Sequence, residues 1–440
     1  MKHRIVVLGA GYAGAYSAGN LARRLSRKDA EITVINALPE FVQRQRLNQL
    51  AAGRDIEAPK LTDVFAGTGI RLLVARVTAL DPERRVVTVA GAASATGAAS
   101  GASATSAASA AGAVSATGAA SAAGDTGDTD DSDPNDHEVG YDTLLYALGS
   151  QVADQSVPGV TEHGFDVAGR ASALRLRTHL DSLHRRGHGG RVLVVGDGFT
   201  GIETATEVAE SLPNLSVALL ARGELGARLS LHARRHLRRA CDRLGITVLE
   251  HTSVEAVESN RVRCAGGTLL ASDATVWTAG FAVSPIAAAG GLEVTDTGQI
   301  VVDRVMRSVS HPSIYAVGDS VHILGDNGRP LPMNCGSAGF TGRQAFEAII
   351  GQLTGRKIPT IKLVHQYNAI SLGRRDGILH LIDDAARPKP KHLGGRSAVR
   401  IKAGIQWAAL WSTSHPTFGL PRRGRRLIFR DIGEAAAPPR

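Results

Sequence analysis

The chain of 440 residues contains only three cysteines. They form neither a CxxC pair nor a Cys/His cluster, which excludes a disulfide scaffold and an iron–sulfur or zinc site, so we expect no metal. No charge-free apolar run reaches the roughly 18 residues that a membrane-spanning helix needs. Motifs that interleave basic and aromatic residues are also missing, so we expect no nucleic-acid partner. With 43% hydrophobic and 21% charged residues, the composition is typical of a soluble, globular, intracellular protein.

The first residues resemble the start of a signal peptide, because a basic segment (residues 1–4) precedes an apolar one (residues 5–8). Three glycines, Gly9, Gly11 and Gly14, then interrupt the apolar segment. This spacing favours a buried strand followed by a tight turn. We therefore expect a cytoplasmic protein, or one bound peripherally at the inner face of the cytoplasmic membrane.

Residues 90–138 consist largely of Ala, Gly, Ser, Thr and Asp. Such a composition buries too little apolar surface to offset the entropy of ordering, so we predict a flexible surface insertion. The insertion separates two segments that are typical of strands, residues 85–89 and 141–147. Because the entropy of loop closure grows slowly with length, we expect its removal to leave folding and activity intact.

Elsewhere, short apolar runs alternate with helix-like segments. Strands are predicted at residues 4–8 and 32–35, with a helix at 15–24 between them. The same pattern returns with strands at 191–195 and 216–220 around a helix at 201–211. Two such units predict two related α/β domains with parallel sheets, joined by a crossover near residues 156–160.

Each strand–helix junction carries a glycine-rich turn. The first turn is Gly9-Ala10-Gly11-Tyr12-Ala13-Gly14, a pattern that lets a pyrophosphate approach the backbone at a helix N-terminus. Asn36 ends the next strand, at the position where an acid usually binds the ribose. Asn36 can form uncharged hydrogen bonds there, or it can be an ordinary turn residue.

The second turn contains Gly196, Gly198 and Gly201, and two such patterns in one chain are far more specific than one. After the following strand, Ala221 replaces the acid that would bind the ribose of NADH, and Arg222 follows it. This favours tolerance of NADPH, unless Arg222 is only a solvated surface residue.

These motifs resemble those of the FAD/NAD(P)-dependent pyridine nucleotide oxidoreductases, and within them the type II NADH dehydrogenase-like proteins. The resemblance also rests on residues 141–150, 276–281 and 314–319, and it covers roughly residues 1–89 and 139–385. It implies an α/β fold with two Rossmann-like dinucleotide-binding domains, in which an inserted NAD(P) domain splits the FAD domain, plus a C-terminal α+β region. The expected segments are FAD domain 1–89, insertion 90–138, FAD domain 139–165, NAD(P) domain 166–275, FAD domain 276–350 and basic C-terminal region 351–440.

The resemblance also implies the roles of individual residues. Glu203 matches a family glutamate between nicotinamide and flavin, although an acid in a first helical turn can also serve as a cap. Asp319 is expected to bind a ribityl hydroxyl, and Val77 to pair with adenine through its backbone. The other residues expected to contact FAD or NAD(P)H are Tyr12, Ala13, Arg44, Gly149, Gly280, Gly318, Gly336 and Ser337. Leu148 departs from the family, which has Thr there.

No cysteine occupies the positions that family members with thiol chemistry use. The expected reaction is therefore hydride transfer from NAD(P)H to FAD, followed by electron transfer to a quinone or another small-molecule acceptor. Two alternatives remain, a soluble flavoprotein that acts on a specialised metabolite or a protein, and a redox-signalling protein with slow turnover.

Positive charge gathers at one end of the chain. Residues 351–440 contain 17 Lys and Arg but only 5 Asp and Glu. A predicted helix at residues 396–411 carries Arg400 and Lys402 beside Trp407 and Trp411, which is typical of an interfacial helix on anionic lipid. An ordinary solvated surface or a homodimer contact would also account for this composition.

Overall fold

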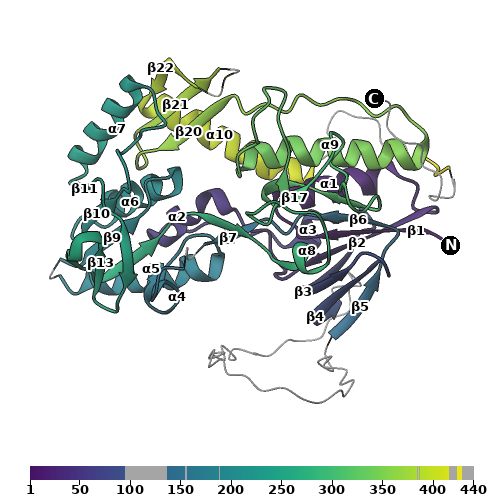
Figure 1. The fold of residues 1–440 in the computed structure, drawn as a ribbon, viewed down its shortest axis with the longest axis horizontal. Helices are drawn as coiled ribbons and strands as arrows, with labels where there is room; N and C mark the ends of the chain where they lie inside the picture. Colours follow the sequence, from purple (N-terminus) through teal and green to yellow (C-terminus); the bar gives the residue numbers. More distant parts are fainter. Residues whose placement is uncertain are drawn as a thin grey trace.

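The computed structural model describes residues 1–94, 136–153, 156–187, 189–383, 385, 387–415 and 424–428. Two sheets, each flanked by helices, form the two halves of the molecule (Figure 1). The expectation of an α/β fold with two Rossmann-like units is confirmed. Among the described residues, no helix is both long and apolar enough to cross a bilayer.

The larger sheet has seven strands in the order β18-β6-β1-β2-β3-β4-β5. The first five are parallel, and β4 and β5 complete one edge as antiparallel strands. Strand β1 is buried except at Arg4 and ends in four apolar residues, as is typical of a parallel strand covered on both faces. The strands are β1 (His3–Leu8), β2 (Ala30–Asn36), β3 (Arg71–Asp81), β4 (Val86–Ser94), β5 (Asp136–Gly140), β6 (Thr143–Tyr146) and β18 (Ile314–Ala316).

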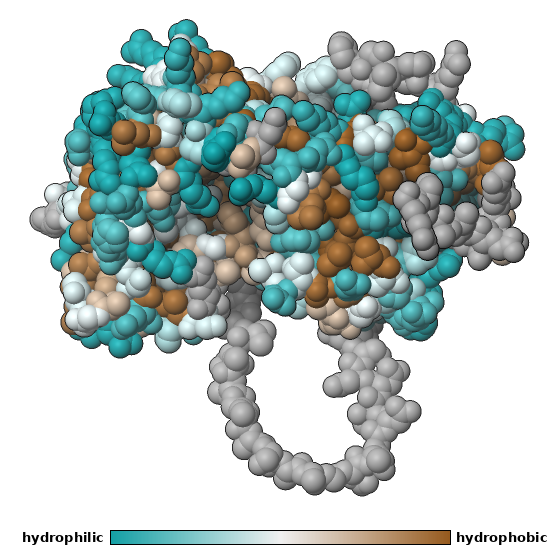
Figure 2. All heavy atoms as spheres, turned by 45° about the horizontal axis from the view of Figure 1, so that its top comes forward, coloured by the Kyte–Doolittle hydropathy of each residue, from teal (hydrophilic) through white to brown (hydrophobic). Residues whose placement is uncertain are grey.

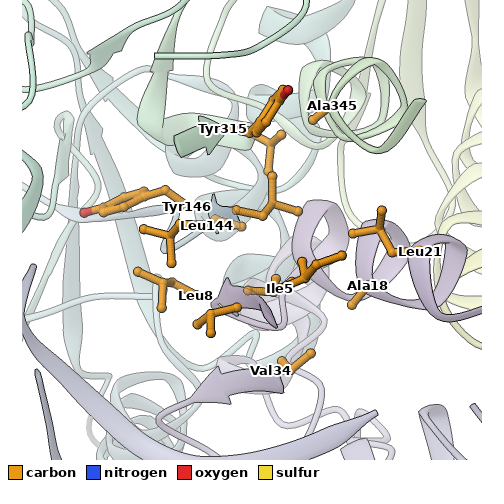
Figure 3. Packing of buried hydrophobic residues seen from close by; sticks show 14 of the residues in the cluster. Ile5, Leu8, Ala18, Leu21, Val34, Leu144, Tyr146, Tyr315 and Ala345 are labelled. Atoms are coloured by element: carbon orange, nitrogen blue, oxygen red, sulfur yellow. The ribbon is translucent and has the colours of Figure 1, made fainter. Parts of the chain in front are cut away.

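Two helices, α1 (Tyr12–Arg24) and α9 (Cys335–Thr354), pack together on one face of this sheet (Figure 1). A bidentate ion pair connects the two helices: two Arg24 nitrogens lie 2.7 and 2.8 Å from the two Glu347 carboxylate oxygens. Figure 3 shows the core beneath them, where Leu21 of α1 and Ala345 of α9 lie over the strands. This packing fixes the end of β1, from which the first glycine turn emerges.

The second sheet has five strands in the order β11-β10-β9-β15-β8, and every pairing is parallel. Its first βαβ unit follows the sequence prediction closely, since β9 and β10 have the predicted bounds. The strands are β8 (Gly164–Phe165), β9 (Arg191–Val195), β10 (Ser216–Leu220), β11 (Thr247–Leu249) and β15 (Ala274–Trp277), and the helices are α5 (Arg170–Arg185), α6 (Phe199–Ser211) and α7 (Leu231–Arg243).

Two antiparallel strands, β7 (Ser150–Val152) and β16 (Phe281–Val283), carry the chain into and out of the second half. The second half is thus inserted between β6 and β18 of the larger sheet. The predicted boundary at residue 165 assigns β8 to the FAD domain, whereas β8 pairs with β15 of the second sheet. Two residues are too few to give a strand signal in the sequence.

The predicted insertion is shorter at both ends than residues 90–138. Strand β4 continues to Ser94, and β5 starts at Asp136 and pairs with β4. Pairing along a sheet edge overrides the low strand propensity of Ala and Gly in this segment. Residues 95–135 lie outside the described part of the chain.

The C-terminal region folds into a three-stranded antiparallel sheet followed by a long helix. The strands are β20 (Tyr367–Ser371), β21 (Gly377–Ile382) and β22 (Pro388–Gly394), and the helix is α10 (Gly395–Ser414). This unit contacts α6 and α7 of the second half and α1 of the first (Figure 1). It therefore bridges the two halves.

Shorter elements complete the described fold. They are η1 (Arg44–Arg46), α2 (Leu47–Ala51), α3 (Leu61–Val64), α4 (Val160–His163), β12 (Val254–Val257), β13 (Arg261–Cys264), η2 (Ala265–Gly267), β14 (Leu269–Ala271), α8 (Ile286–Ala289), β17 (Ile300–Val301), η3 (Gly318–Ser320) and β19 (Val321–His322).

Candidate active site

The first glycine turn has the geometry that a bound pyrophosphate requires. Gly9 has φ of +90°, and a Cβ there would lie 2.5 Å from the Ala147 carbonyl oxygen. A Cβ on Gly14 would lie 2.0 Å from the Gly9 carbonyl oxygen, so only glycine lets α1 start this close to β1. A Cβ on Gly11 would meet nothing within 4 Å. The turn thus leaves open space in front of the helix N-terminus.

The second turn repeats this arrangement. Gly196 has φ of +109°, and a Cβ on Gly201 would lie 1.8 Å from the Gly196 carbonyl oxygen. Gly198, like Gly11, faces open space. Both helices that follow these turns begin without a side-chain cap, so their first N–H groups are available to a ligand.

Both turns open into one cavity of about 1600 Å³. Figure 2 shows the surface hollowed between the two halves of the molecule. Of the residues predicted to bind cofactors or act in catalysis, those that line the cavity are Gly9, Gly11, Tyr12, Ala13, Asn36, Arg44, Gly149, Gly196, Gly198, Glu203, Arg222, Gly280, Gly318, Asp319 and Gly336.

Four predicted residues do not line the cavity. Gly14 and Gly201 lie behind the turns, where they permit close helix–strand packing. Ser337 is buried, with 3% of its surface exposed, inside the first turn of α9. Val77 pairs with Val89 in the β3–β4 ladder. Strand pairing and helix packing therefore hold Val77 and Ser337 away from the cavity wall.

Asn36 supports the first glycine turn. Its Oδ1 accepts a hydrogen bond from the Ala10 N–H at 2.9 Å, and its Nδ2 donates to the Leu38 carbonyl at 2.7 Å. An amide can do both at once, whereas a carboxylate could only accept. The side chain lines the cavity while it holds the backbone of the turn.

Asp319 lies in a short chain of polar contacts at the centre of the cavity. The Ser150 hydroxyl donates to its Oδ2 at 2.7 Å, and Arg44 donates to the Ser150 carbonyl at 2.6 Å. Gly149 has φ of +74°, and its N–H donates to the Ser320 hydroxyl at 3.2 Å. These hydrogen bonds connect the loop after β6 to the loop after β18. The other carboxylate oxygen of Asp319 has no protein partner among the described residues.

The N-terminus of α9 points into the same cavity. Asn334 is the N-cap, and its Oδ1 accepts a hydrogen bond from the Ser337 N–H at 2.9 Å. Cys335, Gly336 and Ala338 of the first turn line the wall. A helix N-terminus stabilises negative charge in front of it, which suits the electron-rich edge of a reduced flavin.

The Cys335 thiol and the Tyr12 hydroxyl, both close to the start of α9, have raised pKa values and do not exchange protons at neutral pH. Burial and the neighbouring Asp319 raise the pKa of the Cys335 thiol to about 12, so it stays protonated at neutral pH. Burial also raises the pKa of Tyr12. The Tyr12 residue lines the cavity, but its hydroxyl oxygen is buried and has no hydrogen-bond partner among the described residues.

The glutamate predicted to be catalytic has two partners from the C-terminal region. Glu203 Oε1 forms an ion pair with Lys402 of α10 and accepts a hydrogen bond from the Ser371 N–H at 2.9 Å. The side chains of Glu203 and Lys402 are only 11% and 12% exposed. The expectation that Lys402 is one of the basic residues of an interfacial helix is wrong, because its side chain is nearly buried and lines the cavity.

The C-terminal sheet is anchored to the second half by charged contacts. Arg374 Nε lies 3.2 Å from a carboxylate oxygen of the buried Glu207 on α6. Asp376 receives hydrogen bonds from His236 at 2.8 Å and Arg243 at 2.7 Å, both on α7. Although burial opposes ionisation, these bonds hold the pKa of Asp376 below its usual range. The anchors fix the position of α10 and so of Lys402.

Three histidines make stability dependent on pH. Burial lowers the pKa of His3, His380 and His392, and for the last two neighbouring histidines lower it further. The unfolded chain therefore binds more protons below about pH 6.5, the usual histidine pKa. Their contribution to stability is complete above that pH and is lost as pH falls through the folded pKa values.

We expect the midpoint temperature of thermal unfolding to decrease when the pH is lowered from 7 to 5. Each unit of pKa depression corresponds to about 1.4 kcal/mol. In His380→Gln, the slope of midpoint against pH should be shallower, measured by calorimetry in buffers of equal ionic strength. A slope that is unchanged in this variant, or a midpoint that rises on acidification, would contradict the assignment.

The cavity fits two dinucleotides. Each glycine turn provides open space at an uncapped helix N-terminus, and the two turns face one continuous volume. The Asp319 carboxylate, with one oxygen unpartnered among the described residues, supplies a polar contact on the wall of the first half. The residues present therefore suit FAD at the first turn and NAD(P)H at the second.

Comparisons with known proteins agree with this geometry. The sequence profile of the pyridine nucleotide-disulphide oxidoreductases matches residues 3–342. The NADH dehydrogenase-like protein Rv1812c of Mycobacterium tuberculosis is 28% identical over 394 residues, which cover 84% of this chain and 86% of that protein. A type II NADH:quinone oxidoreductase of Staphylococcus haemolyticus is 23% identical over 405 residues, covering 86% and 89%.

A solved structure shares the fold. NDH2 from Plasmodium falciparum in complex with NADH superposes with a TM-score of 0.71 at 14% identity, covering 95% of this chain and 97% of that one. The profile match spans both glycine turns and Asp319. The chain belongs to the pyridine nucleotide-disulphide oxidoreductase family and is an oxidoreductase that uses FAD and NAD(P)H.

Proposed function

We propose that the protein oxidises NAD(P)H and passes the electrons through FAD to a quinone-type acceptor, without redox-active cysteines. The observation that carries this proposal is the single cavity shared by both glycine turns, Glu203 and Lys402. When bound, the two cofactors supply the redox chemistry, and the protein supplies orientation and electrostatics.

Glu203 is well placed to orient the nicotinamide. It lies in the first turn of α6, directly after the second glycine turn, and its carboxylate is held by Lys402 and the Ser371 N–H. A fixed carboxylate can accept a hydrogen bond from a carboxamide and set the stacking distance of the ring. The ion pair with Lys402 restrains that carboxylate.

Thiol chemistry is disfavoured by the positions of the cysteines. Cys241 and Cys264 are buried in the second half of the molecule, and burial raises the pKa of both. Cys335 lines the cavity alone, with its pKa raised to about 12. A reactive cysteine needs a lowered pKa and, for disulfide exchange, a partner.

The acceptor would enter beyond the N-terminus of α9, where the C-terminal region completes the cavity. Met333, Ile405 and Ala409 line this part, together with the polar Gln406 and His365. Apolar walls with a few polar groups are typical of sites for planar organic molecules. Relatives named type II NADH:quinone oxidoreductase support a quinone as the acceptor.

Oxidation of NADH and NADPH in the presence of menadione tests this function. We expect acceptor-dependent turnover that thiol alkylation leaves intact, because no step uses a cysteine. A protein that binds FAD but shows no turnover with menadione would refute the quinone reductase and favour a signalling role.

The outer face of α10 supports peripheral membrane contact. Trp407 is 65% exposed and Ile401 43% exposed, whereas Gln406 of the same helix is buried. The exposed Arg396 and Arg400 flank these apolar residues. An apolar helix face with basic neighbours favours binding to anionic lipid.

We expect the protein to co-sediment with vesicles that contain anionic phospholipid at low salt and to dissociate at high salt. The double variant Ile401→Ser with Trp407→Ser should bind several-fold more weakly. Leu381→Ser, which removes a leucine that is 53% exposed on β21, is the control. Absence of binding at low salt would refute this contact, and loss of a dimer in the double variant would assign the face to a second copy.

A further inference from the structure

A row of polar side chains runs from the C-terminal sheet to the cavity. Asn368 of β20 and His380 of β21 are paired residues of neighbouring strands, and Asn368 Nδ2 lies 3.3 Å from His380 Nε2. Asn368 Oδ1 lies 2.9 Å from His365 Nε2. His365 Nδ1 is in turn 3.4 Å from Nδ2 of Asn334, the N-cap of α9. Asn334, His365 and Asn368 line the cavity, whereas His380 is buried.

The direction of these hydrogen bonds fixes which nitrogen of His365 carries a proton. Asn334 Oδ1 accepts the Ser337 N–H, so the Asn334 amide nitrogen faces His365 and can only donate. His365 Nδ1 therefore accepts, and Nε2 carries the proton that Asn368 Oδ1 accepts. The row thus holds a neutral imidazole firmly at Nε2. Its basic nitrogen, Nδ1, has only the longest contact of the row, which a ligand at the start of α9 can replace.

His365 is the one histidine that lines the cavity in the described part of the chain. Histidine is the side chain whose charge ordinarily changes between pH 5 and pH 8, so it can take a proton from water and pass it on near neutral pH. Two other titratable groups of this wall are unsuited to that task. Cys335 keeps its proton because its pKa is raised to about 12, and Lys402 is held in an ion pair with Glu203.

The elements that hold His365 present no charge to it. Asn334 of α9 and Asn368 of β20 are neutral amides. His380 of β21 is neutral at pH 7 as well, because burial lowers its pKa. Within the described residues, no carboxylate oxygen lies within 4 Å of a His365 ring nitrogen. An anionic group that develops on a bound acceptor would therefore be the first negative charge beside this ring.

Reduction of a quinone to a quinol takes up two electrons and two protons. The hydride of NAD(P)H supplies two electrons and one proton, so each turnover needs one further proton. We propose that His365 is the catalytic residue that donates this proton, from Nδ1 to an oxygen atom of the acceptor. The new O–H bond forms as the Nδ1–H bond breaks, and the neutral imidazole then regains a proton from water. This inference rests on the proposed function, because it names the proton donor for the quinone-type acceptor.

Asn368 is the positioning residue for this step. Its Oδ1 accepts the Nε2–H of His365 in both protonation states, and the hydrogen bond becomes charge-assisted and stronger when the imidazole is protonated. The ring therefore keeps its place while Nδ1 gains and loses a proton. His380 orients Asn368 in turn, because its Nε2 accepts from the Asn368 amide nitrogen.

The test compares two electron acceptors with the purified, FAD-loaded protein after reduction by NAD(P)H. Menadione takes up protons when it is reduced to the quinol, whereas ferricyanide takes up electrons only. In His365→Gln, reoxidation by menadione should slow about 100-fold, and reoxidation by ferricyanide should stay within about twofold of wild type. His232→Gln, which removes an exposed histidine of α7 outside the cavity, should leave both rates unchanged. Stopped-flow absorbance measures both reactions.

Asn368→Asp produces an effect that a merely structural role of the row would not. The new carboxylate lies beside the Nε2–H of His365 and favours the protonated imidazole. The rate of reoxidation by menadione should fall with rising pH in wild type, and in this variant the fall should lie about one pH unit higher. His380 can donate from Nε2 to the new carboxylate, because its Nδ1 has no partner to lose among the described residues.

A further measurement needs no acceptor. In NMR spectra of protein labelled with ¹⁵N-histidine, the signals that His365→Gln removes should show a proton on Nε2 and none on Nδ1 at high pH. The opposite tautomer, an unchanged menadione rate in His365→Gln, equal slowing with both acceptors, or a pH profile that Asn368→Asp does not move would overturn the assignment. Absence of menadione turnover in wild-type protein would instead overturn the proposed function.

Discussion

Replacing Glu203 by Gln is expected to slow reduction of bound FAD by NAD(P)H about 10- to 100-fold while the FAD content stays at the wild-type level. The carboxylate is neutralised but its size is kept, so the cavity retains its shape. The variant loses the fixed hydrogen-bond acceptor that positions the nicotinamide. A small misplacement of reacting groups slows a reaction by about 10- to 100-fold. Anaerobic stopped-flow absorbance measures the rate without any acceptor.

Lys402 makes this prediction more specific. Glu203→Gln leaves Lys402 as a nearly buried charge without its partner, which costs stability as well as rate. Adding Lys402→Met should restore much of the stability but not the rate of flavin reduction. Glu162→Gln, an exposed glutamate of α4 outside the cavity, is the control. A wild-type reduction rate in Glu203→Gln would show that Glu203 only anchors the C-terminal region.

The second large effect concerns the middle glycine of each turn. Gly11→Ala and Gly198→Ala place a methyl group in space that is open in the protein itself, and both backbones have extended conformations that alanine adopts easily. We expect both variants to fold with wild-type stability. Gly11→Ala should be purified with little FAD, since the methyl occupies the space of the pyrophosphate.

Gly198→Ala should instead retain FAD and show a KM for NAD(P)H that is raised at least tenfold. The contrast between the variants assigns each turn to its cofactor, using the FAD/protein absorbance ratio and steady-state kinetics. Gly339→Ala, an exposed helical position of α9 with open space around it, is the control and should bind both cofactors normally. Full FAD content in Gly11→Ala would contradict the assignment of the first turn.

Local patterns explain what the sequence could predict. A glycine turn is a contiguous segment whose geometry depends on residues within a few positions, so Gly9, Gly11, Gly196 and Gly198 were identified from their spacing alone. Asp319 is implied instead by the resemblance of residues 314–319 to a family motif at a strand end. The alternation of buried strands and amphipathic helices likewise predicted the two parallel sheets.

Long-range contacts explain what the sequence could not predict. Glu203 and Lys402 are 199 residues apart, and nothing near Lys402 marks it as facing inward rather than belonging to a basic surface. The contact of Arg228 with the Phe199 ring at the start of α6 likewise joins segments that are far apart in the sequence. Strand β4 extends into a segment of low complexity because of its partner β5, and pairing of this kind leaves no mark in composition.

The central claim is that one cavity brings NAD(P)H and FAD together. Its most direct test is the visible absorption spectrum of the purified protein, recorded without oxygen during titration with NADPH and then NADH. We expect a yellow protein whose flavin band disappears with about one equivalent of nucleotide per bound FAD. A protein that stays colourless when supplied with FAD, or a flavin band that neither nucleotide bleaches, would contradict it.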